Sequence, residues 1–477
     1  MENFRDFLKH ADIKFKECEN HFAVKNPANG EILAFIKKTN ANEISQILTG
    51  MQKAQKEWAN LNALQRSDIM LKWHEKIVQN REMLAEIMTL EQGKAIKEAR
   101  GEIDYAASFV RWFAEECRRI DGDILTPLKQ TQKLFVINQP IGVCAAITPW
   151  NFPSSMITRK AAPALACGCA MIVKSASATP LSAYALQILA QKAGIPNDVF
   201  IIVNGDASEI SDAFCKSDTV RKITFTGSTE VGSKIYEKSA KTIKKISLEL
   251  GGNAPVIVFD DANLQKAVDG VIASKFRNSG QTCVCANRVY AQSGIYDALC
   301  EKLVKKVKEM KIGEGIKEDT DFGPLINESA VEKVEELIKD ALNKGAKCLL
   351  GGKRSTLGGT FFEPTILNGA TSKMKFAKEE IFGPLCPIFK FENIDDVINQ
   401  TNDTKYGLAS YIFTENLNTI TKVSEALEYG MVGVNTGLIS NEVAPFGGVK
   451  MSGLGREGSK YGIAEYMQKK YICVDIK

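Results

Sequence analysis

The sequence predicts an α/β protein with two doubly wound units, and three observations lead to this class. Short, fully apolar runs alternate with stretches of helical periodicity between residues 141 and 250. A similar alternation starts again near Pro255, after a glycine pair at 251–252 that we take as the join. The chain has 477 residues, which is more than one hydrophobic core usually serves. Apolar strands separated by helices indicate parallel sheets that helices cover on both faces.

The first unit is expected to contain five strands with helices between them. Segment 180–194 carries apolar residues at i, i+3 and i+4, as an amphipathic helix does. An earlier helix at 45–61 has Leu48, Met51 and Trp58 on one face, and we expect this face to pack against the sheet. The strands are expected at 141–147, 170–174, 199–203, 222–226 and 246–250.

The second unit is expected to begin with a strand at 255–259. A helix at 263–276 with a regular apolar stripe follows it and leads into a loop that holds two cysteines. Two more amphipathic helices are expected at 297–310 and 330–343, and Gly345 closes the second of them. The sequence shows no internal repeat and no low-complexity linker.

The composition limits the classes of function. The 61 basic and 57 acidic residues give a formal net charge of +4, too even a balance for a nucleic-acid-binding face. No run is long and apolar enough to span a bilayer, and the charged N-terminus does not resemble a secretory signal. Twelve cysteines without an export signal indicate reduced thiols. We therefore expect a cytoplasmic protein that binds small molecules.

The stretch GQTCVCANR at 280–288 places Cys283 and Cys285 one residue apart with no histidine nearby. It could be half of a metal site, a redox pair or a catalytic nucleophile with a neighbour. All three histidines lie within the first 74 residues, so a cysteine–histidine pair has little support. Any general base is therefore expected to be a carboxylate.

Two glycine-rich stretches could hold phosphate. Residues 227–232 (GSTEVG) follow a predicted strand and open a helix expected at 233–240, whose N-terminus could bind a pyrophosphate; a plain strand-to-helix turn is the equal alternative. The stretch is not the phosphate loop of a nucleotide hydrolase, because Ser233-Lys234 replaces the required Lys-Ser/Thr pair. Residues 453–458 (GLGREG) follow a loop instead of a strand, so we expect a turn there.

Four stretches of the chain resemble one family, the NAD(P)-dependent aldehyde dehydrogenases. Their order and separation match that family over nearly the whole chain. The four stretches are 148–153 (TPWNFP), 248–252 (LELGG), 280–283 (GQTC) and 379–384 (EEIFGP).

The resemblance implies an aldehyde dehydrogenase fold with three parts. A Rossmann-like cofactor domain would comprise 1–121 and 142–252, and an α/β catalytic domain would comprise 253–435. A small β oligomerisation element would comprise 122–141 and 461–477. The family also implies a homodimer or a homotetramer.

The resemblance assigns three catalytic residues. Cys283 would be the nucleophile that attacks the aldehyde carbonyl. The side-chain amide of Asn151 and the backbone N–H of Cys283 would stabilise the oxyanion. Glu249 would be the general base, and its apolar surroundings in LELGG should raise its pKa as that role requires.

The resemblance also assigns a cofactor site, with one departure from the family pattern. Many members carry a glutamate on the adenosine ribose where this chain has Ser177, while Lys174 is present. Loss of the carboxylate removes repulsion of a 2′-phosphate, so we expect NADP to be preferred, with NAD as an alternative. The residues assigned to the cofactor are Trp150, Lys174, Ser177, Gly227, Ser228, Gly232, Glu380 and Phe382.

Within the family the likeness is greatest to succinate-semialdehyde dehydrogenases, through KFRN before the cysteine loop and GLIS at 437–440. By this likeness Arg159, Arg277 and Ser440 would grip the distal carboxylate of the substrate. A structural ion pair is the alternative for either arginine. Glutarate semialdehyde and lactaldehyde stay open as substrates. A non-catalytic nucleotide-binding protein is the alternative from a different class.

Cys285 has no necessary part in this chemistry. No further thiolate or histidine stands at ligand spacing, so we expect no metal site. Cys285 is either a small packing residue or a redox partner that forms a strained, easily reduced disulfide with Cys283. Inactivation by peroxide that dithiothreitol reverses would fit the second case, and the same reversible loss in Cys285→Ala would exclude it.

Overall fold

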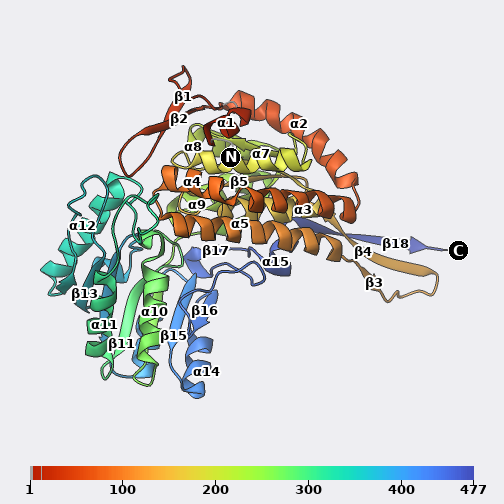
Figure 1. The fold of residues 1–477 in the computed structure, drawn as a ribbon. Helices are drawn as coiled ribbons and strands as arrows, with labels where there is room; N and C mark the ends of the chain where they lie inside the picture. Colours follow the sequence, from red (N-terminus) through yellow and green to blue (C-terminus); the bar gives the residue numbers. More distant parts are fainter. Residues whose placement is uncertain (1–3, 12, 477) are drawn as a thin grey trace.

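The computed structural model describes residues 4–11 and 13–476, and they form two sheet-based units and a projecting arm (Figure 1). The predicted α/β class is confirmed. Within these residues no helix combines the length and apolar character that crossing a membrane requires.

The first unit is built on a six-stranded sheet with the order β17-β9-β8-β5-β6-β7. Its first five strands in chain order are parallel and lie in the order 3-2-1-4-5, which is that of a dinucleotide-binding sheet. The point where the order reverses lies between β5 and β8. The strands are β5 Val143–Ile147, β6 Ala170–Lys174, β7 Phe200–Val203, β8 Val220–Thr226, β9 Lys245–Glu249 and β17 Gly453–Leu454.

Helices cover both faces of this sheet, which explains why its strands are apolar throughout. Cys144 and Ala146 of β5 face one helical core, while Val143 and Ala145 face another. The first core contains α3 Ala63–Gln79, α4 Arg81–Gln92, α5 Ile96–Glu116, α6 Ser155–Cys167 and α7 Pro180–Ala193. The second contains α2 Ala41–Asn60, α8 Ala207–Lys216 and α9 Thr229–Ser239, so the predicted packing of the early helix is confirmed.

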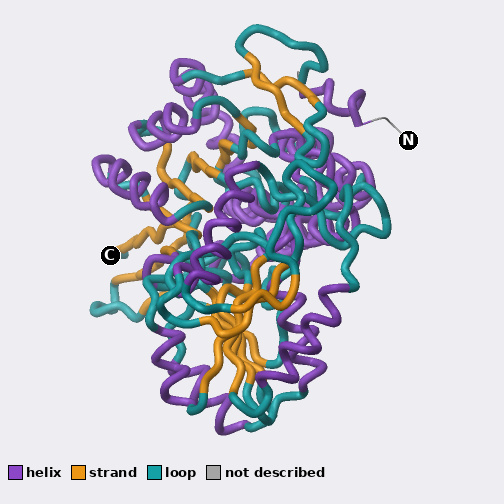
Figure 2. Tube along the Cα trace, turned by 90° about the vertical axis from the view of Figure 1, so that its left-hand side faces the viewer, coloured by secondary structure: helices purple, strands orange, loops and turns teal. Residues whose placement is uncertain are grey.

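The second unit is a seven-stranded sheet with helices on both sides (Figure 2). Its strand order is β12-β13-β14-β11-β10-β15-β16, and only β12 pairs antiparallel. The strands are β10 Ala254–Val258, β11 Ala286–Gln292, β12 Lys347–Leu350, β13 Thr365–Ala370, β14 Leu385–Phe391, β15 Ala409–Phe413 and β16 Met431–Val434. The helices are α10 Leu264–Lys275, α11 Tyr296–Lys308, α12 Glu328–Asn343, α13 Ile394–Asn402 and α14 Leu417–Ala426.

A three-stranded antiparallel sheet projects from the first unit and carries the C-terminus (Figure 1). It consists of β3 Asp123–Leu125, β4 Gln132–Pro140 and β18 Met467–Asp475. The remaining elements are α1 Phe4–Leu8, the hairpin of β1 His21–Lys25 and β2 Ile32–Lys37, and α15 Ser459–Ala464. The division into domains at 121/122, 141/142, 252/253 and 460/461 stays a prediction.

Two glycine-rich stretches differ from the expectation in detail. Helix α9 begins at Thr229, four residues early, because the Ser228 hydroxyl caps it by accepting from the Val231 N–H at 3.3 Å. Close packing requires a glycine at 232 inside the helix, because a Cβ there would stand 2.4 Å from Leu250. Gly453 starts an edge strand beside β9 instead of a plain turn, and a Cβ there would meet the Leu248 carbonyl at 1.9 Å.

Candidate active site

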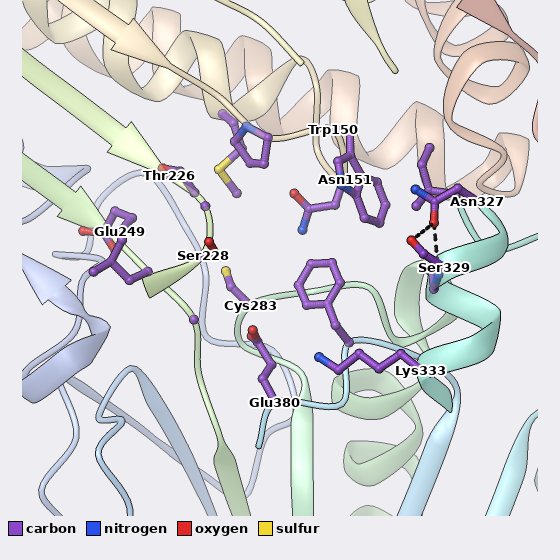
Figure 3. A pocket seen from close by; sticks show the side chains of 18 residues that line it. Trp150, Asn151, Thr226, Ser228, Glu249, Cys283, Asn327, Ser329, Lys333 and Glu380 are labelled. Carbon is purple, nitrogen blue, oxygen red and sulfur yellow. Dashed lines mark hydrogen bonds between the residues drawn. The ribbon is translucent and has the colours of Figure 1, made fainter. Parts of the chain in front are cut away.

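A pocket of about 350 Å³ opens at the carboxyl ends of β5 and β8, where the strand order of the first sheet reverses. Ligands of open α/β sheets bind at such a point. Side chains from both units enter this pocket, so they converge from elements far apart in the sequence (Figure 3). The predicted site residues that line it are Trp150, Asn151, Gly227, Ser228, Glu249, Cys283, Glu380 and Phe382.

Cys283 follows a tight turn that aims its side chain into the pocket (Figure 3). Asn278 and Ser279 in that turn have φ of 51° and 55°, a left-handed conformation that side chains rarely adopt. Burial raises the pKa of the Cys283 thiol to about 12, while the charge of Arg159 opposes this shift. The thiol is therefore protonated near neutral pH in this state, and a base must take its proton before it can attack.

Asn151 lies beside the cysteine loop and is held there by hydrogen bonds. Its Nδ2 donates to the Gln281 carbonyl at 2.9 Å. The backbone carbonyl of Asn151 accepts from Lys94 Nζ at 2.7 Å and from Asn278 Nδ2 at 2.9 Å. An amide donor fixed next to a nucleophile suits stabilisation of an oxyanion.

Lys94 belongs to a buried network that the sequence did not reveal. Its Nζ donates to Glu102 Oε2 at 2.6 Å and lies 4.0 Å above the Phe152 ring. Glu102 accepts in turn from the Ser154 N–H at 2.9 Å. Lys94 lies in the loop between α4 and α5, and Glu102 lies on α5. Charged residues at such positions are usually exposed, so only the packing shows that this pair anchors the loop of Asn151.

Glu249 lies at the carboxyl end of β9. Both of its carboxyl oxygens are buried and lack a hydrogen-bond partner among residues 4–11 and 13–476. Burial raises the pKa of Glu249 well above its usual range, and the charge of Glu457 adds to this while Arg159 opposes it. A carboxyl group with a raised pKa and free oxygens suits a general base.

Gly227 and Ser228 directly precede the first turn of α9 and line the pocket together with Trp150 and Phe382. A side chain at Gly227 would not fit, because a Cβ there would meet the Phe225 ring at 2.5 Å. Trp150 and Phe382 meet edge to face at 5.7 Å, and Phe382 has a left-handed φ of 53°, which is unusual for an aromatic residue. Together with the N-terminus of α9, these groups fit a dinucleotide.

Glu380 lies across the pocket from Trp150 (Figure 3). Its Oε1 accepts from the Gly252 N–H at 3.0 Å, and burial raises its pKa to about 7. Lys333 of α12 lines the same pocket and acts electrostatically on Glu380. The sequence analysis missed Lys333, since a lysine on an amphipathic helix carries no distinguishing pattern.

Lys174 and Ser177 lie together but do not line the pocket that holds Cys283. Lys174 Nζ donates to the Ser175 carbonyl at 2.9 Å and to Ser177 Oγ at 3.3 Å. Burial lowers the pKa of Lys174 to about 8, with the charge of Asp206 opposing this shift. Lys174 is the last residue of β6, the strand next to β5 in the sheet, and Ser177 follows it in the loop.

The three residues assigned to the substrate carboxylate also lie outside that pocket's lining. Arg159 is buried, its Nε lies 2.6 Å from Glu457 Oε2, and its guanidinium lies 4.0 Å from the Phe446 ring. Its Nη2 is nevertheless buried without a hydrogen-bond partner among the described residues. Arg277 lies over Phe152 at 5.2 Å and, like Ser440, is half-buried. The structural ion pair that was the alternative for Arg159 therefore exists, and it leaves Nη2 of this arginine without an acceptor among the described residues.

Cys285 is buried against Lys275. Its thiol donates to the Lys275 carbonyl at 3.2 Å, and Lys275 Nζ lies 3.4 Å from its Sγ. Cys283 and Cys285 are both free thiols. The reversible disulfide between them stays a prediction. Within the part of the chain that the structure describes, no group of three or more His, Cys, Asp or Glu side chains is arranged to hold a metal ion.

Comparison with protein families matches residues 14–472 to the model of the aldehyde dehydrogenase family. The chain belongs to the aldehyde dehydrogenase family. It is accordingly an oxidoreductase that acts on an aldehyde, and the alternative of a non-catalytic nucleotide-binding protein is set aside.

Two curated relatives and one solved structure are closely similar to this aldehyde dehydrogenase. The succinate-semialdehyde dehydrogenase [NADP(+)] of Escherichia coli (strain K12) is 55% identical over 95% of this chain and 94% of its own. The glutarate-semialdehyde dehydrogenase of Pseudomonas putida KT2440 is also 55% identical, with the same coverage of 95% and 94%. A crystal structure of an aldehyde dehydrogenase from Brucella melitensis biovar abortus 2308 has a TM-score of 0.95 and 57% identity, covering 96% of this chain and 94% of that one.

Proposed function

We propose that this enzyme oxidises succinate semialdehyde to succinate, with NADP as the preferred hydride acceptor and NAD as an alternative. The observation that carries the proposal is one pocket, at the reversal point of a dinucleotide-binding sheet, lined by Cys283, Asn151 and Glu249. The Escherichia coli relative, which is named for succinate semialdehyde and NADP(+), supports the choice of substrate and cofactor. Glutarate semialdehyde is the second candidate, because an equally similar relative is named for it.

The residues of the pocket supply each step of aldehyde oxidation. Glu249 takes the proton of the Cys283 thiol, directly or through a water, and Sγ then attacks the aldehyde carbon. The resulting alkoxide accepts hydrogen bonds from Asn151 Nδ2 and the Cys283 N–H. NADP, when bound, supplies the hydride acceptor. The thioester left on Cys283 is hydrolysed by a water that gives its proton to Glu249.

We propose that Arg159, Arg277 and Ser440 bind the distal carboxylate of the substrate. Arg277→Ala removes a charge-assisted hydrogen bond, so KM for succinate semialdehyde should rise about tenfold to a hundredfold. KM for butanal, which has four carbons and no carboxylate, should change less than about twofold. Steady-state kinetics with both aldehydes measure the difference, and equal effects on both would contradict the assignment.

A panel of aldehydes tests the substrate class itself. Succinate semialdehyde, glutarate semialdehyde, lactaldehyde and butanal are compared by kcat/KM, with reduced-cofactor absorbance as the readout. The proposal expects succinate semialdehyde to rank first. A higher kcat/KM for butanal would overturn the carboxylate site, and a higher value for glutarate semialdehyde would change the substrate within the same class.

The cofactor preference has its own test at Ser177. Ser177→Glu places a carboxylate beside Lys174, which should repel a 2′-phosphate and pair with the lysine, so the NADP-to-NAD ratio of kcat/KM should fall at least about tenfold. Because the pKa of Lys174 is lowered to about 8, wild-type KM for NADP should also rise at higher pH as the ammonium loses its proton. A wild-type preference for NAD that Ser177→Glu leaves unchanged would refute the assignment.

We further propose a homodimer or homotetramer that works in the cytoplasm. The projecting sheet exposes apolar side chains, with Ile124 81% and Leu128 99% exposed, as a surface for a second copy would. Light scattering after size-exclusion chromatography tests the assembly. The catalytic thiol needs a reducing compartment, and cell fractionation tests the location.

A further inference from the structure

We infer that the hydroxyl of Tyr105 is a further specificity-determining donor, which binds the distal acid group of the substrate beside Arg159 and Arg277. The inference deepens the proposed function and rests on it. No part of the four sequence stretches that carry the family resemblance includes this residue. It reaches the site only through the packing of α5.

The first observation is that the Tyr105 hydroxyl is buried and has no hydrogen-bond partner among residues 4–11 and 13–476. Buried hydroxyl groups are nearly always paired, because leaving one unpaired costs free energy. Arg159 Nη2 is likewise buried without a hydrogen-bond partner among the described residues. Two buried donors without acceptors in one region indicate that an acceptor arrives from outside, and a carboxylate offers about four lone-pair sites.

The second observation is the arrangement of the rings and charges around Tyr105. Its ring meets Phe109, one turn along α5, edge to face at 4.9 Å. The guanidinium of Arg159 lies 5.4 Å from the same Phe109 ring. Tyr105, Phe109 and Arg159 therefore form one continuous wall.

The charged groups that act electrostatically on the Tyr105 hydroxyl include both arginines proposed to bind the substrate. They are Arg159 and Arg277, followed by Glu457 and the Cys283 thiol. Burial raises the pKa of Tyr105, and the two arginines oppose this only in part, so the hydroxyl keeps its proton and can donate. A neutral donor that two cations and the reactive thiol influence electrostatically suits the acid end of a substrate whose other end is the aldehyde.

The third observation ties the loop of Ser440 to the same helix. Ser108 Oγ lies 3.2 Å from Glu442 Oε2 and 2.8 Å from the Tyr105 carbonyl, and these two acceptors share its single proton. Ser440 is two residues from Glu442, so its loop docks next to Tyr105. The proposed donors to the acid group thus come from α6, the cysteine loop, the Ser440 loop and α5.

Tyr105→Phe tests the inference, because it removes only the hydroxyl. KM for succinate semialdehyde should rise about tenfold, while kcat and the KM for butanal should change less than about twofold. The inhibition constant of succinate, which carries the acid groups without the reactive carbonyl, should rise by the same factor as KM. The melting temperature should stay equal or rise, since an unpaired buried hydroxyl is removed.

Tyr429→Phe is the matched control. The Tyr429 hydroxyl donates to the Thr401 carbonyl at 2.6 Å and accepts from Arg288 Nη2 at 2.8 Å, away from the pocket. This variant should lower the melting temperature without any change that distinguishes the two aldehydes.

The outcomes separate this inference from the proposed function. If Tyr105→Phe affects both aldehydes equally, or lowers the melting temperature with no change in KM for succinate semialdehyde, the hydroxyl is structural and the inference is wrong. If Arg277→Ala still discriminates between the aldehydes in that case, the proposed function stands. If the wild-type enzyme prefers butanal, the proposed function fails first.

Discussion

Replacing Cys283 with alanine is expected to lower kcat by about 10⁴-fold or more, with every tested aldehyde and with either cofactor. The reason is that the thioester mechanism splits the oxidation into two steps, and both need a bond to Sγ. Of the residues that the structure describes, no other cysteine lines the pocket. The neighbouring Cys285 cannot replace it, because it is buried against Lys275.

Two measurements distinguish loss of chemistry from loss of structure. Titration with NADP should give a dissociation constant within about threefold of the wild-type value, since the cofactor residues are untouched. Cys300→Ala removes a buried thiol from α11, outside the pocket, and should keep most of the activity. If Cys283→Ala turned over aldehyde at the wild-type rate, the whole proposed mechanism would be wrong.

The fold could be predicted because its strands carry an unambiguous signal. A strand buried on both faces must be apolar at every position, and Val143–Ile147 and Ala170–Lys174 are almost entirely so. The sequence predicts a later start for α9 than the structure shows, because a glycine at 232 disfavours a helix locally. The close contact with Leu250 nevertheless requires a glycine at this position. Tertiary packing thus overrode local propensity.

The site could be predicted only where its residues fall in compact motifs. Cys283, Asn151 and Glu249 each lie in one of the four matched stretches, and the structure brings all three to one pocket. Lys94 lies in the loop before α5 and Tyr105 lies on α5, and nothing in the sequence separates either from ordinary core or surface residues. Their placement depends on how α5 and the loop before it pack.

The Arg159–Glu457 ion pair is another feature that could not be predicted from the sequence. The two residues are nearly 300 positions apart, and no spacing rule links them. Once paired, Arg159 still presents an unpaired Nη2. The two interpretations weighed from the sequence, a structural ion pair and a substrate ligand, are therefore compatible, and only the contact geometry shows it.

Glu249→Gln is expected to lower kcat by about 10² to 10⁴-fold, because the amide cannot accept a proton from the thiol or from the hydrolytic water. Thioester hydrolysis should suffer most, so rapid mixing should show a first turnover that is faster than those that follow. Mass spectrometry of the mixture should detect the acyl group on Cys283. A steady rate without a burst would place the loss before the thioester forms.

The pH dependence identifies the carboxyl group more directly. Because burial raises the pKa of Glu249, the wild-type kcat/KM should increase with pH as Glu249 loses its proton. The variant should lack that rise and keep only the dependence due to Cys283, whose pKa is raised to about 12. An unchanged profile would mean that another group is the base.

The free energy of unfolding changes with pH in the opposite direction to kcat/KM, so its measurement excludes misfolding as the cause of a lower kcat. Between the ordinary glutamate pKa of about 4.3 and the raised folded value, the unfolded chain has lost the Glu249 proton while the folded chain keeps it. The free energy of unfolding therefore falls as pH rises through this range, and Glu249→Gln removes that fall. The variant should be at least as stable as the wild type near neutral pH while turning over far more slowly, a combination that general damage to the fold cannot produce.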